Sequence, residues 1–185
     1  MSKTLFINAC ARENSRTLEL ANHVLNKLGT EYEEVKLYET DISPLDAKGM
    51  QERDAAFEAK DFSDSRFDLA KQFASAETIV IAAPYWDLMF PSVLKVYYEA
   101  VTVNGIAFVY GENGVPASLC KAKRLIYVTT SGGPIMKNFG YDYTFALAKA
   151  FYGVEEVKCI SAEKLDIRGA DVENILRNAK DSVEI

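Results

Sequence analysis

Three uninterrupted apolar runs stand out along the chain, at residues 4–9, 78–83 and 125–130. Such runs predict strands buried on both faces, because a strand covered by helices on each side has no polar face to alternate with. A more polar run at 32–37 and another run at 154–160 predict two further strands, the first of them more exposed.

Between these runs, apolar residues recur at intervals of three and four, which is the spacing of a helix with one buried face. The pattern predicts helices over 18–28, 67–74, 94–101, 147–152 and 172–179. Gly29 and Gly153 follow two of them as candidate caps, and Pro91 suits the first position of another.

Two segments fit neither pattern. Residues 40–61 are polar and contain the breakers Pro44 and Gly49, so we expect a long surface excursion with a helical turn near 51–59. Residues 105–116 combine strand formers with glycines, which favours a small hairpin or arm.

Alternating strands and helices indicate an α/β fold with right-handed crossovers and a parallel sheet. The most apolar strands, the first, third and fourth, belong at its centre. We therefore predict a three-layer sandwich, with helices on both faces of a five-stranded sheet of order 2-1-3-4-5. A ligand is then expected outside the carboxyl ends of strands one and three. No linker or repeat interrupts residues 1–185, so we expect a single domain.

Composition narrows the functional classes. The net charge of −6 disfavours a nucleic-acid groove, and no apolar stretch is long enough for a membrane span. The thiols of Cys10, Cys120 and Cys159 form no C-x-x-C pair, which indicates free cysteines in the reducing cytoplasm. One histidine and three scattered cysteines predict no metal site.

The loop after the first strand, residues 10–17, carries hydroxyls and positive charge into the start of a helix. Ser15 and Thr17 supply the hydroxyls, and Arg12 and Arg16 supply the guanidinium groups. Together with the free N–H groups of a helix start, they suit a phosphate. An equally open alternative is that Asn14 or Ser15 only caps the helix and that the arginines are solvated.

The loop after the third strand groups several large apolar side chains, including Tyr85, Trp86 and Leu88. A turn seldom needs so many, and exposed aromatics of this kind favour a surface that binds a flat ring system. Alternatively, they pack against the core or a partner subunit. After the fourth strand, the paired glycines of residues 129–134 either let the backbone approach a ligand closely or form a simple turn.

At these loops the sequence resembles the flavodoxin-like NAD(P)H oxidoreductases that include FMN-dependent azoreductases and quinone reductases. The matching segments are residues 14–17, 83–87 with 94–95, and 130–133. Residues 105–114 are also similar to the "G-x-x-F-x-Y-x-x-x-G" arm of that family. The chain departs from the azoreductases in having Tyr85-Trp86-Asp87 where they commonly have Met-Tyr-Asn, and Thr130-Ser131 where they have Ser-Arg.

The resemblance implies an FMN-binding flavodoxin-like domain. Three groups of residues would hold the cofactor: Cys10, Arg12, Ser15, Arg16 and Thr17 around its phosphate, Pro84, Tyr85, Trp86, Asp87 and Leu88 along the isoalloxazine, and Thr130, Ser131, Gly132 and Gly133 at its pyrimidine end. An amide of Trp86 or Asp87 would lie near flavin N5, and amides of Gly132 and Gly133 would face N1 and O2.

The activity so implied is ping-pong transfer of hydride from NADH or NADPH through FMN to a quinone, an azo dye or a similar small electron acceptor. The flavin carries the chemistry, and no catalytic side chain is assigned. The arm and the aromatic loop suggest a homodimer. Two alternatives remain: a flavodoxin-type electron carrier without NAD(P)H activity, and a hydrolase or binding module whose flavin site is empty.

Overall fold

The computed structural model describes residues 3–185. It contains a sheet of five parallel strands, in the order β2-β1-β3-β6-β7, and a separate two-stranded antiparallel hairpin. The sheet strands are β1 (Thr4–Asn8), β2 (Tyr32–Lys36), β3 (Thr78–Ala82), β6 (Arg124–Thr130) and β7 (Glu156–Ala162), and the hairpin pairs β4 (Phe108–Tyr110) with β5 (Pro116–Ser118). The predicted sheet order and the predicted hairpin are both confirmed.

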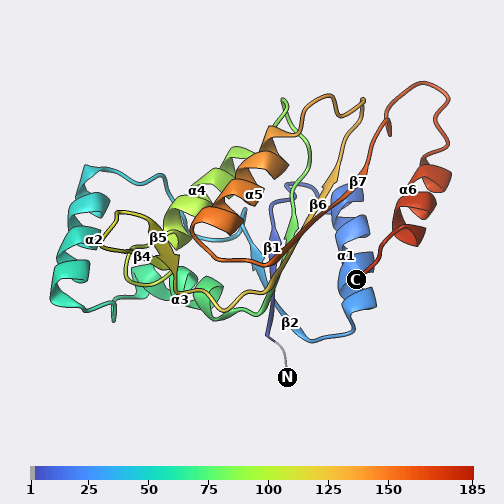
Figure 1. The fold of residues 1–185 in the computed structure, drawn as a ribbon. Coiled ribbons are helices and arrows are strands. Elements are labelled where there is room, and N and C mark those ends of the chain that lie inside the picture. Colours follow the sequence, from blue (N-terminus) through green and yellow to red (C-terminus); the bar gives the residue numbers. More distant parts are fainter. Residues whose placement is uncertain (1–2) are drawn as a thin grey trace.

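Helices cover both faces of this sheet (Figure 1). Those next to the sheet are α1 (Arg16–Leu28) and α6 (Val172–Asp181) on one face, and α3 (Asp68–Ser75), α4 (Ser92–Val101) and α5 (Phe139–Ala150) on the other. A short 3-10 turn, η1 (Ser65–Phe67), precedes α3. Gly29 closes α1 in the left-handed conformation, as the sequence predicts.

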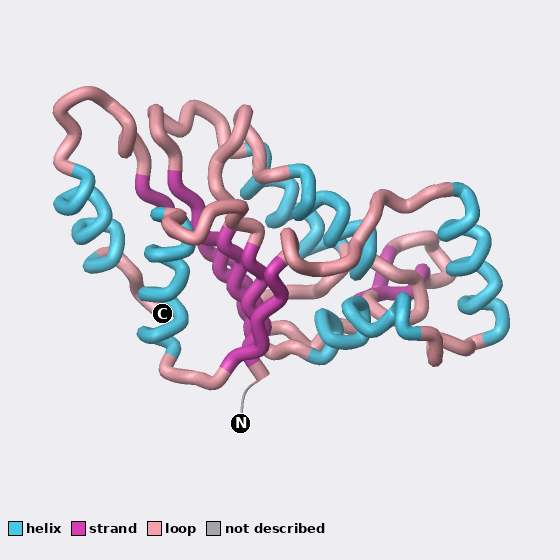
Figure 2. Tube along the Cα trace, turned by 180° about the vertical axis from the view of Figure 1, so that it is seen from behind, coloured by secondary structure: helices cyan, strands magenta, loops and turns pink. Residues whose placement is uncertain are grey.

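The prediction of five helices was one short. Where the sequence indicated an irregular excursion with one helical turn, the chain forms α2 (Ala47–Ala59), capped by Asp46, whose side chain accepts from the Gly49 N–H at 2.7 Å. None of the α2 residues is buried, so no apolar stripe marks this helix in the sequence. Seen from behind, α2 and the β4–β5 hairpin extend together away from the sheet (Figure 2).

Two smaller expectations were also wrong. Pro91 lies at the N-cap of α4, one residue before the helix begins at Ser92. Gly153 follows α5 in a left-handed conformation, but the residue that caps the helix is Phe151.

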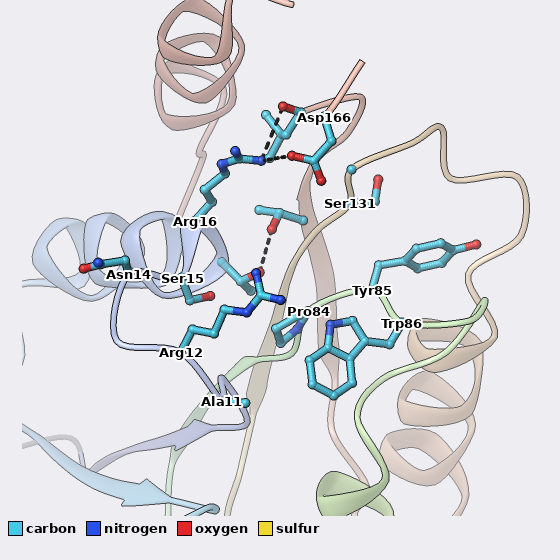
Figure 3. A pocket seen from close by; sticks show the side chains of 14 residues that line it. Ala11, Arg12, Asn14, Ser15, Arg16, Pro84, Tyr85, Trp86, Ser131 and Asp166 are labelled. Atoms are coloured by element: carbon cyan, nitrogen blue, oxygen red, sulfur yellow. Dashed lines mark hydrogen bonds and ion pairs between the residues drawn. The ribbon is translucent and has the colours of Figure 1, made fainter. Parts of the chain in front are cut away.

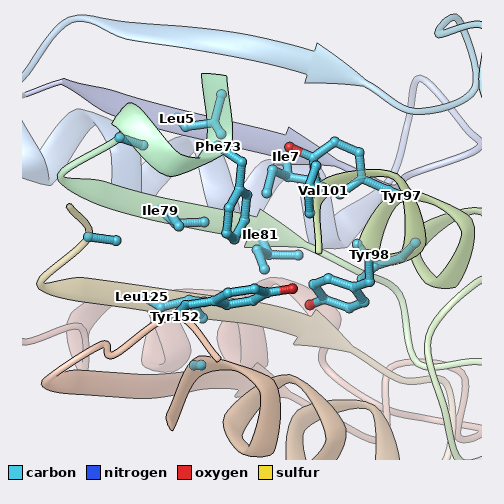
Figure 4. Close-up of a cluster of buried hydrophobic side chains, with 14 of the residues drawn as sticks. Leu5, Ile7, Phe73, Ile79, Ile81, Tyr97, Tyr98, Val101, Leu125 and Tyr152 are labelled. Carbon is cyan, nitrogen blue, oxygen red and sulfur yellow. The ribbon is translucent and has the colours of Figure 1, made fainter. Parts of the chain in front are cut away.

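Alternate residues of each central strand feed two apolar cores. Ile7, Ile79, Ile81 and Leu125 face the side covered by α3, α4 and α5, where they meet Tyr97, Tyr98 and Tyr152 (Figure 4). The intervening residues pack beneath α1 and α6. Burial on both faces fixes the strands, and with them the loops that leave their carboxyl ends. Within the described part of the chain, no helix is long and apolar enough to cross a membrane.

Candidate functional site

The loops at the carboxyl ends of the central strands meet in one cleft of about 330 Å³ (Figure 3). It receives residues from the β1–α1 loop and the first turn of α1, from the β3–α4 loop, from the β6–α5 loop and from the β7–α6 loop. Its lining residues are Ala11, Arg12, Asn14, Ser15, Arg16, Thr17, Pro84, Tyr85, Trp86, Thr130, Ser131, Gly132, Leu165 and Asp166.

The start of α1 forms one end of the cleft. Ser15 is the N-cap, and its hydroxyl accepts from the Leu18 N–H at 3.3 Å, so the capping alternative for this residue is realised. The N–H groups of Arg16 and Thr17 bond to no acceptor among the described residues, as expected in the first turn of a helix. Two amides and the positive end of the helix dipole are thus available to an anion.

A buried hydrogen bond ties this helix to the end of β6. The hydroxyl oxygens of Thr17 and Thr130 lie 2.6 Å apart, and the two residues are 1% and 9% exposed. One hydroxyl proton is used between them, which leaves the other for a further acceptor. The contact holds two of the predicted site segments in a fixed relation.

The two arginines of the cleft lie in different surroundings. Arg12 is exposed and forms no ion pair with any described residue; it lies across the cleft from Trp86 (Figure 3). Arg16 reaches over to the β7–α6 loop, where its Nη1 donates to Asp166 Oδ1 at 2.7 Å and to the Leu165 carbonyl at 3.3 Å. Only Arg12 therefore offers a free guanidinium.

The β3–α4 loop holds a tight turn in an uncommon conformation. Trp86 and Met89 exchange backbone hydrogen bonds of 2.9 and 2.8 Å, and Asp87 and Leu88 between them have φ values of 50° and 69°. Two consecutive non-glycine residues in the left-handed region are costly, and such strain gathers at binding sites. The Trp86 N–H is already hydrogen-bonded within this turn, so of the two amides expected near a flavin only that of Asp87 has no acceptor among the described residues. The Trp86 side chain is 44% exposed.

The β6–α5 loop is pinned to the β7–α6 loop. The Ser131 and Gly132 carbonyls accept from the Leu165 and Asp166 N–H groups at 3.1 and 2.9 Å. A Cβ at Gly132 would fall 2.2 Å from Asp166 Oδ2, whereas a Cβ at Gly133 would meet nothing within 4 Å. A side chain at position 132 would thus displace the Asp166 carboxylate, whereas position 133 has room for one. Neither glycine's N–H bonds to an acceptor in residues 3–185.

Most residues assigned from the sequence come together. Those lining the cleft are Arg12, Ser15, Arg16, Thr17, Pro84, Tyr85, Trp86, Thr130, Ser131 and Gly132. Gly133 adjoins the lining, and Asp87 and Leu88 lie farther along the strained turn.

Cys10 lies outside the lining. It lies near the start of the β1–α1 loop and is half-buried, with its thiol 3.9 Å from the Ala82 carbonyl, and burial raises the pKa of this thiol to about 11. It is therefore a protonated packing residue at neutral pH.

The sequence did not identify Ala11, Leu165 and Asp166 as site residues, and Asn14 entered only as a possible helix cap and as part of the matching segment 14–17. Leu165 and Asp166 follow β7, the fifth predicted strand. The rule that ligands bind at carboxyl ends could have included this loop, but its composition carries no signal comparable to the paired glycines or grouped aromatics.

Different kinds of group line successive parts of the cleft. Free amides and a guanidinium gather at the α1 end, an indole and a phenol lie at the β3–α4 loop, and two further amides lie at the β6–α5 loop. This donor set fits an anionic group joined to a flat ring with acceptor atoms on its far edge, which is the chemistry of FMN. No group of three metal-ligating side chains occurs in the described region.

Comparison with known proteins agrees with this architecture. The model of a family described as having a flavodoxin-like fold matches residues 2–184. The FMN-dependent NADH:quinone oxidoreductase of Coprothermobacter proteolyticus is 32% identical, over 100% of this chain and 97% of its own length. The FMN-dependent NADH:quinone oxidoreductase 2 of Clostridium acetobutylicum is 35% identical, over 96% and 94%.

Solved structures share the fold at lower identity. An azoreductase from Bacillus anthracis superposes with a TM-score of 0.84 at 20% identity, covering 98% of this chain and 96% of that one. A second B. anthracis structure, an FMN-dependent NADH-azoreductase in complex with FMN, gives a TM-score of 0.80 at 23% identity, covering 98% and 95%. The chain therefore belongs to the family with the flavodoxin-like fold, together with these FMN-dependent NADH:quinone oxidoreductases.

Proposed function

We propose that this protein is an FMN-dependent NAD(P)H oxidoreductase that reduces small acceptors such as quinones or azo compounds. The observation that carries the proposal is the meeting of the β1–α1, β3–α4 and β6–α5 loops in one cleft, with anion-binding groups at one end and a ring-binding surface beside them. The names of its relatives support the same activity and favour NADH as the reductant.

At the α1 end, the amides of Arg16 and Thr17 and the guanidinium of Arg12 would hold the FMN phosphate. When bound, FMN supplies the redox chemistry, accepting hydride from NAD(P)H and delivering electrons to the acceptor. The protein contributes binding, orientation and local charge, and no side chain acts as a nucleophile.

At the other end, Trp86 and Tyr85 would border the flat ring. Tyr85 is held in place by its own hydroxyl, which donates to the Lys137 carbonyl at 3.0 Å. The amides of Gly132 and Gly133 would face the pyrimidine edge, where preformed donors favour added negative charge.

We also propose that residues 1–185 act as one domain within a homodimer. Large apolar side chains are exposed both beside the cleft and on the hairpin: Leu88 and Met136 on the loops with Phe139 at the start of α5, and Tyr110 and Val115 on the hairpin. Exposed apolar groups of this size favour a surface that a second copy of the chain covers. Light scattering coupled to size-exclusion chromatography tests this, and a mass of one chain would contradict it.

The central experiment begins with purified protein depleted of ligand. FMN titration should quench the fluorescence of Trp86, the only tryptophan in the sequence, and should give the absorbance band of bound flavin near 450 nm, a property of the cofactor itself. Anaerobic NADH should then bleach this band without a partner reductase. Binding without bleaching would indicate the electron-carrier alternative, and no binding of FMN would refute the proposal.

A variant pair tests the phosphate end. Arg12→Ala should weaken FMN binding by about ten- to a hundredfold, since a charge-assisted contact is worth roughly 1.5–3 kcal/mol. Arg177→Ala, which removes the same charge from an exposed position on α6, is the matched control. Equal FMN affinities of the two variants would contradict the assignment of Arg12. Ser15 is a poor probe, because its hydroxyl also caps α1.

A further inference from the structure

Asp166 brings a negative charge into a cleft whose other charged lining groups are arginines. Its Oδ1 lies 2.7 Å from Arg16 Nη1, and its carboxylate packs on Gly132. A carboxylate is an unexpected neighbour for a phosphate-binding end, since like charges repel. Its one ion-pair partner among the described residues is Arg16, at the first position of α1.

The two partners differ in how freely they can move. The backbone around Asp166 is fixed, because the N–H groups of Leu165 and Asp166 donate to the carbonyls of Ser131 and Gly132. Arg16, by contrast, reaches the loop through a long flexible side chain, held by the carboxylate and by the Leu165 carbonyl at 3.3 Å. The guanidinium can leave while the carboxylate stays.

Breaking this ion pair also costs little free energy. The side chains of Arg16 and Asp166 are 40% and 68% exposed, and ion pairs of that exposure contribute little because water screens them. A phosphate at the α1 end would offer Arg16 more charge than one carboxylate, with the helix amides beside it. The Arg16 side chain therefore has two acceptors within the same cleft, one internal and one belonging to a ligand.

We infer that Asp166 is a specificity-determining residue that competes with the ligand phosphate for Arg16, and thereby limits how strongly the cleft prefers phosphorylated over unphosphorylated flavins. The inference rests on the proposed function, since it assumes that a flavin occupies this cleft. It assigns to the β7–α6 loop a role in ligand choice, exerted through Arg16.

The test compares FMN with riboflavin, which carries the same ring without the phosphate. Both are titrated into ligand-depleted protein and followed by Trp86 fluorescence. Asp166→Asn should free Arg16 and strengthen FMN binding by up to about fivefold, which is about 1 kcal/mol, and should leave riboflavin binding unchanged. Inorganic phosphate should compete with FMN more strongly in this variant than in the unmodified protein.

Two further variants isolate the competition. Arg16→Ala should weaken FMN binding without changing riboflavin binding, and Asp166→Asn should have little effect when added to Arg16→Ala, because no guanidinium remains to be freed. Glu155→Gln is the matched control for charge. It removes an equally exposed carboxylate that pairs with Lys123 at 2.8 Å, just before β7 and thus at the opposite end of that strand.

Three results would overturn the inference. Weaker FMN binding in Asp166→Asn would mean that the carboxylate positions Arg16 for the phosphate. Equal changes for FMN and riboflavin would mean that Asp166 acts on loop structure. Unchanged binding of both would mean that it has no role. Failure of the proposed function looks different, because the unmodified protein would then bind neither flavin.

Discussion

The buried contact between the Thr17 and Thr130 hydroxyls, 2.6 Å apart, offers a direct test of how the cleft is held together. Thr17→Val keeps the branched shape of the side chain and its place in the first turn of α1, but removes the hydroxyl. The Thr130 hydroxyl, on a residue 9% exposed, then loses its partner. Because the shape is preserved, the lost bond should dominate the effect.

The expected loss follows from the burial of the group that remains. A buried hydroxyl left without a partner costs about 1–3 kcal/mol, whereas replacing both partners by apolar groups of the same shape can be nearly neutral. For a chain of this size, each kcal/mol lowers the unfolding midpoint by about 2–4 °C. Thr17→Val and Thr130→Val should each be destabilised, and the double variant should recover most of the loss.

Thermal and urea unfolding of the four proteins give the coupling free energy directly. Thr17→Ser retains the hydroxyl and serves as the control, with a smaller loss from its missing methyl group. FMN titration on the same proteins shows whether the contact also shapes the binding site. Strictly additive losses in the double variant would refute the reasoning, since they would show that the two hydroxyls do not stabilise one another.

Three other predictions follow from single residues. Gly132→Ala should lower the unfolding midpoint, because its Cβ would collide with the Asp166 side chain. Gly133→Ala should leave the midpoint unchanged, because its Cβ would meet nothing, but should weaken FMN binding. A larger loss of stability in Gly133→Ala than in Gly132→Ala would contradict the packing of Asp166 on Gly132. Leu88→Gly should raise the free energy of unfolding by about 1 kcal/mol by relieving its left-handed backbone, and a lower midpoint in urea would exclude strain at this turn. Burial raises the pKa of Tyr97, so its contribution to stability is complete below the unfolded-state pKa of about 10 and is lost as pH rises above it. Tyr97→Phe removes a buried hydroxyl that has no partner in the described structure. In this variant the urea midpoint should fall less as the pH rises above about 10. An equal fall in the variant and the unmodified protein would refute the prediction.

Hydrophobic patterning alone determined the central architecture. The runs at 4–9, 78–83 and 125–130 became β1, β3 and β6 at the centre of the sheet, because strands covered on both faces exclude polar residues. Parallel strands place their carboxyl ends on one edge, so the loops carrying Ser15, Trp86 and Gly132 had to converge. The grouping of most predicted site residues follows from that rule.

Tertiary structure decided what patterning cannot express. Helix α2 has no buried face, so its sequence gives no periodic signal. The partnership of Arg16 with Asp166 joins residues separated by 150 positions, and the loop that supplies Asp166 has an ordinary composition. Nor does the sequence show that Thr17 bonds to Thr130, or that the Trp86 N–H is hydrogen-bonded to the Met89 carbonyl. Residue types set which interactions are available, but which donor meets which acceptor depends on distances that only the folded chain fixes.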